Sequence, residues 1–136
     1  MPKKIALDAN FVLALVNTEE YSKKVEEIYK LIEANKITAY APIFLLVEVL
    51  NILIKKKKVD PELTKKTLER LKKSQIIFLN TDILIKNSSL LEDLVAKYGV
   101  TSYDAIYLLT AIKSKCKLLT ADQELLKVSE LTISLI

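Results

Sequence analysis

The sequence contains no histidine, one glycine and one cysteine, and each shortage excludes a class of chemistry. Without histidine there is no imidazole base for a catalytic triad and no His-ligated zinc site. A single glycine, Gly99, cannot build a P-loop or a dinucleotide-binding turn. The lone Cys116 forms no internal disulfide, lacks a histidine base and fits a buried, inert residue in a reducing cytoplasm. Carboxylates, lysines and hydroxyls remain for chemistry.

The composition is that of a globular protein with a mild basic excess. Hydrophobic residues make up 51% and charged residues 28% of the 136 residues, and the formal net charge is +4. This length predicts a single domain over residues 1–136. Asp8, Asn10 and Asn17 interrupt the N-terminal apolar run, which argues against a signal peptide or a membrane span. The basic excess permits a phosphate-bearing partner without requiring one.

Short apolar segments alternate with longer helical patterns along the chain. Strands are expected at Lys4–Asp8, Lys36–Ala41, Gln75–Leu79, Lys117–Thr120 and Leu131–Leu135. Helices are expected at Asn10–Val16, Ser22–Asn35, Pro42–Lys57, Pro61–Lys73, Asp82–Tyr98, Ser102–Ser114 and Gln123–Val128. Pro42 and Pro61 fit first helical turns, and Gly99 fits a left-handed helix end. This alternation predicts a three-layer α/β/α domain with a mostly parallel sheet of about five strands.

Four acidic residues stand out by their positions in this pattern. Asp8 and Asp122 follow predicted strands, and Asp104 lies in the first turn of a predicted helix. Glu48 is the only charge within the apolar segment IFLLVEVLNILI. Because ligands of open parallel sheets bind beyond the carboxyl ends of the strands, we expect these carboxylates to converge there. They would repel one another and raise some of their pKa values, and a divalent cation relieves that repulsion.

Each of these acids also has a purely structural explanation. Asp8 and Asp122 fit helix N-caps, and Thr101 with Asp104 fits a capping box. Glu48 has apolar neighbours along its helix and would need an ion pair with a lysine. Taken together, the four acids favour a site for Mg²⁺ or Mn²⁺, because such a site needs no histidine or thiol ligand.

Four short segments of the chain resemble, in order and spacing, the signature segments of the PIN domain. They are ALDANFVLAL, APIFLLVEVLNIL, SYDAIYLLTAI and LLTADQEL, and the resemblance covers essentially the whole chain. It implies a metal-dependent ribonuclease with a parallel sheet flanked by helices. The acidic quartet of the family corresponds to Asp8, Glu48, Asp104 and Asp122. Small single-domain members are often the toxin of a VapBC toxin–antitoxin pair and often dimerise, which implies an RNA substrate, an antitoxin partner and a homodimer.

The resemblance implies a role for each acid. Asp8 would be the central ligand of one or two Mg²⁺ or Mn²⁺ ions, and Asp104 and Asp122 would bind directly or through water. Glu48 would bind through water or act as the base toward the attacking water. Two-metal sites of this kind hold ions about 3.5–4 Å apart. Hydrolysis of the RNA would leave 5′-phosphate and 3′-hydroxyl ends.

Four uncharged residues near these acids have expected roles of their own. Asn10 and Thr120 stand where the family has small polar residues, so both are expected to orient ligands through hydrogen bonds. Helix capping or local turn bonding explains them equally well. Tyr103 and Tyr107 are candidates for stacking on bases, although the apolar neighbours of Tyr107 favour a place in the core.

The lysines supply two candidate surfaces for RNA phosphates. One is the run Lys55–Lys58, and the other consists of Lys113, Lys115 and Lys117. Binding through such contacts weakens as the salt concentration rises. For the first group a solvated helix end is the favoured alternative, because cations stabilise helix C-termini.

Three other readings of the sequence compete with the nuclease. The same fold is compatible with a non-catalytic RNA- or protein-binding module whose acids cap helices, although four intact acids argue against it. A haloacid-dehalogenase-like phosphatase needs a second aspartate where this chain has Asn10. A response-regulator receiver needs an acidic pair where Leu7 precedes Asp8, and it leaves Glu48 unexplained.

Overall fold

The strands of the computed structural model, which describes residues 1–136, form one sheet in the order β3-β2-β1-β4-β5. They are β1 (Lys4–Leu7), β2 (Thr38–Pro42), β3 (Ile77–Leu79), β4 (Lys117–Thr120) and β5 (Thr132–Ser134). Every pairing is parallel, and in the central strand Ile5 lies opposite both Ala39 and Lys117. The predicted parallel sheet of about five strands is confirmed.

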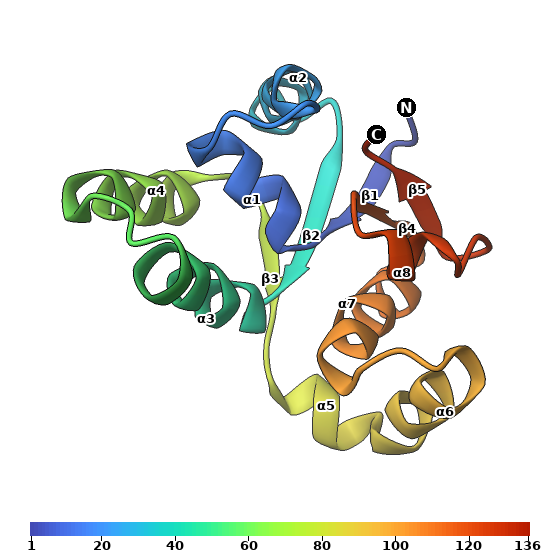
Figure 1. Ribbon diagram of the computed structural model, residues 1–136. Coiled ribbons are helices and arrows are strands. Elements are labelled where there is room, and N and C mark those ends of the chain that lie inside the picture. The colour runs from blue at the N-terminus through green and yellow to red at the C-terminus, as the bar shows by residue number, and fades with distance from the viewer.

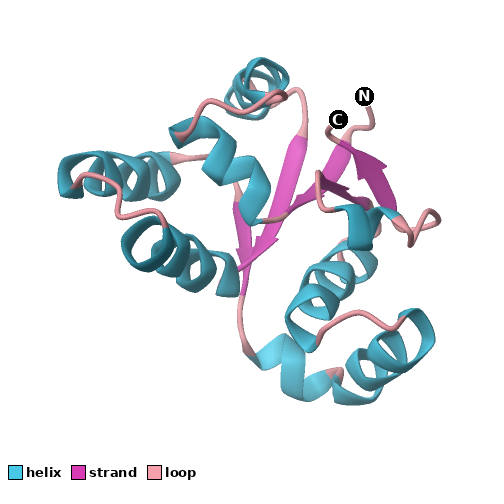
Figure 2. Cartoon of the chain, in the orientation of Figure 1, coloured by secondary structure: helices cyan, strands magenta, loops and turns pink.

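Helices cover both faces of this sheet. They are α1 (Ala9–Val16), α2 (Ser22–Glu33), α3 (Phe44–Leu50), the π-helix η1 (Asn51–Lys56), α4 (Pro61–Lys73), α5 (Asp82–Lys86), α6 (Ser88–Tyr98), α7 (Ser102–Lys113) and α8 (Gln123–Leu126). Helices α1 to α4 lie on one side of the sheet and α5 to α7 on the other, with α7 packed against β1, β2 and β4 (Figures 1 and 2). The three-layer α/β/α prediction is therefore confirmed. None of the helices has the length and apolar character needed to cross a membrane.

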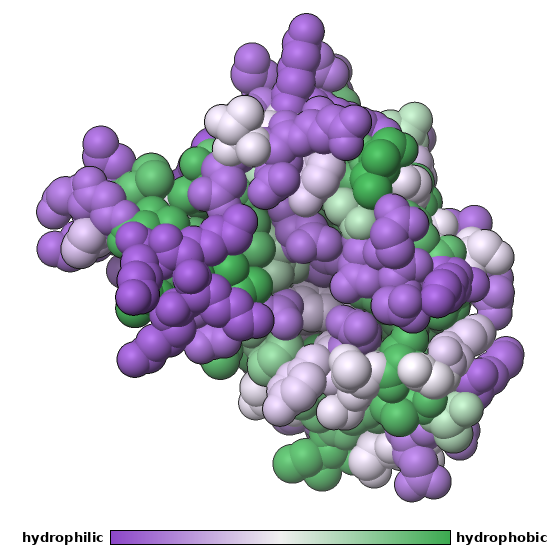
Figure 3. Space-filling model, viewed as in Figure 1, coloured by the Kyte–Doolittle hydropathy of each residue, from purple (hydrophilic) through white to green (hydrophobic).

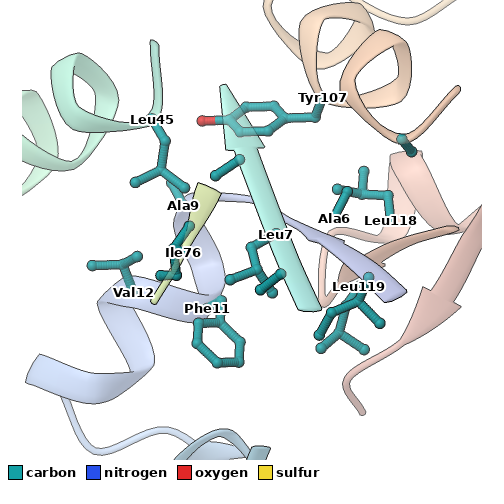
Figure 4. Close-up of a cluster of buried hydrophobic side chains, with 14 of the residues drawn as sticks. Ala6, Leu7, Ala9, Phe11, Val12, Leu45, Ile76, Tyr107, Leu118 and Leu119 are labelled. Atoms are coloured by element: carbon teal, nitrogen blue, oxygen red, sulfur yellow. The ribbon is translucent and has the colours of Figure 1, made fainter. Parts of the chain in front are cut away.

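The hydrophobic core lies between the sheet and the helices on its two faces. Because both faces are covered, consecutive strand residues are apolar and Ile5, Ala6 and Leu7 are all fully buried. Figure 4 shows part of this core, in which Leu7, Phe11 and Leu119 come from β1, α1 and β4. The central strand is thus apolar on both sides up to the residue that follows it.

The prediction that Pro42 lies in the first turn of a helix is wrong. Pro42 is the last residue of β2 and lies opposite Leu79 of β3, while α3 begins at Phe44. The Ile43 N–H donates to the Leu79 carbonyl at 2.9 Å, so the strand pair continues without a donor at Pro42. Pro61, in contrast, is the first residue of α4, as expected.

The expected continuous helix Asp82–Tyr98 is also wrong, because Asn87 divides it into α5 and α6. Its side-chain Nδ2 donates to the Ile83 carbonyl at 2.9 Å and occupies an acceptor at the end of α5. Its backbone (φ −121°, ψ 30°) is not helical. Asparagine favours such local bonds over helix continuation. Gly99 ends α6 in the left-handed conformation, as expected.

The helix expected over Pro42–Lys57 is present from Phe44 onward, but it is not one regular α-helix. It consists of α3 followed by the π-helical turn η1. Only Leu45, Val49 and Leu53 are fully buried, and they repeat every four residues along one face. Val47 and Ile54 are 61% and 51% exposed, so this apolar segment is buried on one face only.

We predict that Leu119→Ala lowers the free energy of unfolding by about 2–5 kcal/mol, because it leaves a cavity among fully buried side chains. Urea denaturation measures this effect. The matched control is Ile85→Ala, at a residue that is 82% exposed, with an expected change of about 0.5 kcal/mol or less. Equal losses in the two variants would contradict the assignment of Leu119 to the core.

Candidate functional site

The direction in which the chain adds strands to the sheet reverses between β1 and β4, and two of the predicted acids follow these two strands. The chain moves from β1 to β2 and β3 on one side and returns to β4 and β5 on the other. Crevices at such switch points are where parallel sheets bind ligands. Asp8 directly follows β1, and Asp122 follows β4 after one intervening residue. Each also caps the next helix, Asp8 accepting from Asn10 N–H at 3.0 Å and Asp122 from Glu124 N–H at 2.8 Å.

One pocket of about 170 Å³ brings all four predicted acids together. Asp8, Glu48, Asp104 and Asp122 line it with Ala9, Asn10, Ile52, Tyr107 and Leu125. Glu48 reaches it from α3 and Asp104 from the first turn of α7, so the two helical layers meet there. In the space-filling view a hydrophilic recess lies near the centre, between the α3 and α7 sides (Figure 3). A larger cavity of about 480 Å³ near α4 and β3 contains no such cluster.

Thr120 connects the two acids that follow strands. Its hydroxyl donates to Asp8 Oδ2 at 2.5 Å and accepts from the Asp122 N–H at 3.0 Å. Thr120 is fully buried, so these bonds are shielded from water. One bond is local and the other crosses from β4 to β1, and Thr120 therefore holds the Asp8 carboxylate in a defined orientation. Asn10 contacts Asp8 through its backbone N–H and not through its side chain.

Tyr107 belongs to the site through a hydrogen bond that the sequence pattern did not reveal. It is 2% exposed, as expected for the core, yet its hydroxyl donates to Glu48 Oε1 at 2.5 Å. Figure 4 shows this hydroxyl directed toward α3. Burial, and then the neighbouring Glu48, raise the pKa of the phenol well above its usual value, so Tyr107 stays a neutral donor. The signal was its spacing of three residues from Asp104, which puts both on one helix face.

Tyr103 has the exposure that a base-stacking residue needs. Its side chain is 60% exposed, and its ring stacks on Phe44 with centroids 5.7 Å apart and planes 15° apart. Thr101 accepts from the Asp104 N–H at 3.1 Å, so one bond of the expected capping box is present. Phe44 and Tyr103 therefore form an aromatic pair beside the first turn of α7.

The candidate lysines do not surround the pocket. Lys113, Lys115 and Lys117 lie at the end of α7 and the start of β4, which is the opposite end of the sheet from the acids. The run Lys55–Lys58 comprises the last two residues of η1 and the two that follow it, and it is exposed. Cys116 is half-buried, and burial raises the pKa of its thiol to about 11, which fits the expected inert residue.

The pocket carries negative charge that no cation of the protein offsets. Burial, with a smaller contribution from the charges of Asp122 and Glu48, raises the pKa of Asp8 from 3.8 to about 7, although the bonds from Thr120 and Asn10 lower it. Burial also raises the pKa of Asp104, followed by the charges of Asp122 and Glu48. None of the four acids forms an ion pair, and no lysine or arginine lines the pocket.

The chemistry of these donors fits a hard divalent cation such as Mg²⁺ or Mn²⁺. Such ions prefer carboxylate and water oxygens, and their charge favours the ionised carboxylates. As the side chains lie, no three acidic or thiol groups are arranged to hold a metal ion. Binding would therefore require the carboxylates to turn toward one another, which the half-buried Glu48 and Asp104 can do more freely than the buried Asp8.

Comparison with protein families gives one match. The family model of the PIN domain matches residues 5–131, which is most of the chain. No curated protein matches the sequence.

Several solved structures share the fold. PAE2754 from Pyrobaculum aerophilum is 20% identical with a TM-score of 0.66, over 97% of this chain and 89% of that chain. A toxin–antitoxin complex from Klebsiella pneumoniae is 17% identical with a TM-score of 0.72, over 97% of this chain and 98% of that chain. VapBC2 from Rickettsia felis, bound to a DNA fragment from its promoter, is 16% identical with a TM-score of 0.68, over 96% of each chain. At these identities the similarity concerns the fold.

We predict that the metal-free protein loses stability as the pH rises from 5 to 8. The folded state holds a proton on Asp8 up to about pH 7, whereas the unfolded state releases it near pH 3.8. The free energy of unfolding should therefore fall by about 2–3 kcal/mol over this range through Asp8. Urea denaturation in EDTA at pH 5 and pH 8 measures the free energy of unfolding of the wild type and of Asp8→Asn. The decrease that Asp8 causes should be absent from Asp8→Asn. The same pH dependence in both proteins would contradict the prediction.

We further predict that Tyr107→Phe weakens Mn²⁺ binding about 10-fold or more, because Glu48 loses the hydroxyl that orients it. The shift of the melting temperature on titration with Mn²⁺ measures the affinity. Tyr103→Phe is the control, since it removes the same atom from an exposed tyrosine. An unchanged affinity in a folded Tyr107→Phe variant would show that the bond does not support the site.

Proposed function

The chain belongs to the PIN domain family, whose members are generally nucleases, and on this premise we propose that it is a metal-dependent ribonuclease. The observation that carries the proposal is the convergence of four carboxylates in one pocket without a protein cation. RNA is the proposed substrate, Mg²⁺ or Mn²⁺ the proposed cofactor, and a single PIN domain over residues 1–136 the proposed catalytic unit.

The proposed roles of the acids follow from their surroundings. Asp8, Asp104 and Asp122 bind the metal, and Glu48 binds it through water or accepts the proton of the attacking water. A bound Mg²⁺ ion activates water and stabilises the charge that develops at the phosphate. The Tyr107 hydroxyl occupies Oε1 of Glu48, which leaves Oε2 for this role.

The groups around the acids hold them in position. Thr120 and the Asn10 N–H together bond both oxygens of Asp8, so this carboxylate is fixed before any ligand binds. Preorganised groups of this kind lower the cost of reaching the reactive geometry. The exposed ring of Tyr103, backed by Phe44, offers a stacking surface for an RNA base.

We also propose that the protein is the toxin of a VapBC-like toxin–antitoxin pair, acts in the cytoplasm and forms a homodimer. The support is the similarity in fold to proteins solved as toxin–antitoxin complexes. Apolar side chains at Val47, Ile54 and Ile85 are more than half exposed, which fits contacts with other protein chains.

A non-catalytic RNA- or protein-binding module is the second candidate. It is favoured by the helix caps of Asp8 and Asp122, because both acids would be retained for stability alone. Glu48 and Asp104 distinguish the two functions, since neither side chain caps a helix through its carboxylate.

We predict that purified protein cleaves a mixed RNA pool with Mg²⁺ or Mn²⁺ and not with EDTA. Asp104→Asn nearly keeps the shape of the side chain and removes a ligand charge, so cleavage should fall by about 100-fold or more. Asp93→Asn, at an exposed acid of α6, is the control and should cleave like wild type. Gel electrophoresis of labelled RNA gives the rates.

A companion melting experiment separates the two candidate functions. If the wild type is inactive on the pool but Mn²⁺ raises its melting temperature, the metal site is intact and its RNA is missing from the pool. No cleavage and no Mn²⁺-dependent shift would contradict the nuclease and favour the binding module.

A further inference from the structure

Lysines gather at the amino ends of the strands, opposite the acid pocket. The basic edge, as we call this surface, consists of Lys3, Lys4, Lys36, Lys113, Lys115 and Lys117. Lys4 begins β1 and Lys117 begins β4, and these two strands are neighbours in the sheet. All six lysines are exposed and none forms an ion pair. The molecule thus has an acidic end and a basic end.

The basic edge includes a concave surface. A cavity of about 460 Å³ is lined by Pro2, Lys4, Lys115, Cys116, Lys117 and Ile133. Two carboxylates adjoin this edge, Glu33 at the end of α2 and Glu130 before β5, and they accept from the Gln75 N–H and the Tyr98 hydroxyl. Six lysines therefore face two carboxylates, and the edge keeps a positive excess for an anionic partner.

Helix ends explain part of this charge. Helices α2 and α7 end at this edge, and lysines near helix C-termini are favourable. Lys115 follows Ser114, the C-cap of α7, and ends this helix in the left-handed conformation with φ +56°. Lys4 and Lys117 begin strands, so a helix end does not account for their charge.

We propose that the basic edge is a second RNA-docking surface, which binds phosphates of the same RNA that the acid pocket cleaves. This inference rests on the proposed ribonuclease function and specifies its substrate class. Five residues of extended chain separate Lys117 from Asp122, or about 16 Å at about 3.3 Å per residue. An RNA that contacts both surfaces must span at least this distance, and a dinucleotide reaches only one of them.

The chain offers a closely matched control at Lys58. This residue also has a left-handed backbone, with φ +48°, and it follows η1 at the end of the run Lys55–Lys58. Lys58→Gly and Lys115→Gly remove one charge each and relieve the same kind of strain. Comparing them also shows which of the two candidate lysine groups contributes to RNA binding.

The experiment measures the affinity of both variants for a labelled tRNA and for a labelled dinucleotide, by fluorescence anisotropy in EDTA. We expect Lys115→Gly to weaken tRNA binding several-fold and to reduce the slope of log K against log salt by about 0.7–0.9. Binding of the short RNA and the melting temperature should not fall. The loss of tRNA affinity in Lys58→Gly should be smaller than the loss in Lys115→Gly.

Two results would overturn the second docking surface. One is wild-type tRNA affinity and salt dependence in Lys115→Gly, which is also the outcome if this edge binds an acidic protein. The other is an equal loss in Lys58→Gly and Lys115→Gly, which indicates an effect of net charge alone. If the wild type itself binds no RNA, the proposed ribonuclease function fails first, so the two failures are distinguishable.

Discussion

The constraint on which the structure depends is the burial of the Asp8 carboxylate at the centre of the sheet. Asp8 is 4% exposed and stands between the fully buried end of β1 and the apolar helix α1. A buried carboxylate is costly unless it is hydrogen-bonded, protonated or paired with a cation. The protein supplies hydrogen bonds from Thr120 and Asn10 but no cation, so the pKa of Asp8 stays near 7. Protonation of Asp8 offsets this cost, and the proposed cation would offset it in another way.

The parallel arrangement of the strands turns this local constraint into the polarity of the whole molecule. Because every strand runs in the same direction, residues that follow strands meet at one edge and residues that precede strands meet at the other. The first edge carries Asp8 and Asp122 with the helical acids Glu48 and Asp104, and the second carries exposed lysines such as Lys117. In the proposed nuclease, lysines away from the acid pocket would attract the RNA, and the pocket itself would remain free for a divalent cation.

Sequence patterns predicted the layers, the parallel sheet and the meeting of the four acids, because these follow from apolar strands and their ends. They did not predict features that depend on contacts between distant elements. Pro42 was expected in a helix because the rule for proline is local, whereas the Ile43 bond to β3 keeps it in the sheet. Asn87 ends a helix through one side-chain bond that propensity alone does not reveal. The hydroxyl of Tyr107 has a partner only because α3 and α7 meet over the sheet, and spacing along α7 says nothing of Glu48.

We propose that the acid pocket binds a divalent cation in place of the proton on Asp8. Calorimetric titration with Mn²⁺ at pH 7, in two buffers with different ionisation enthalpies, tests this exchange directly. Since the pKa of Asp8 is about 7, binding should release about half a proton per site at this pH. The heats should therefore differ between the buffers by about half the difference of their ionisation enthalpies. Saturable binding without proton release would separate the metal from Asp8, and the absence of any binding heat in both buffers would contradict the metal site itself.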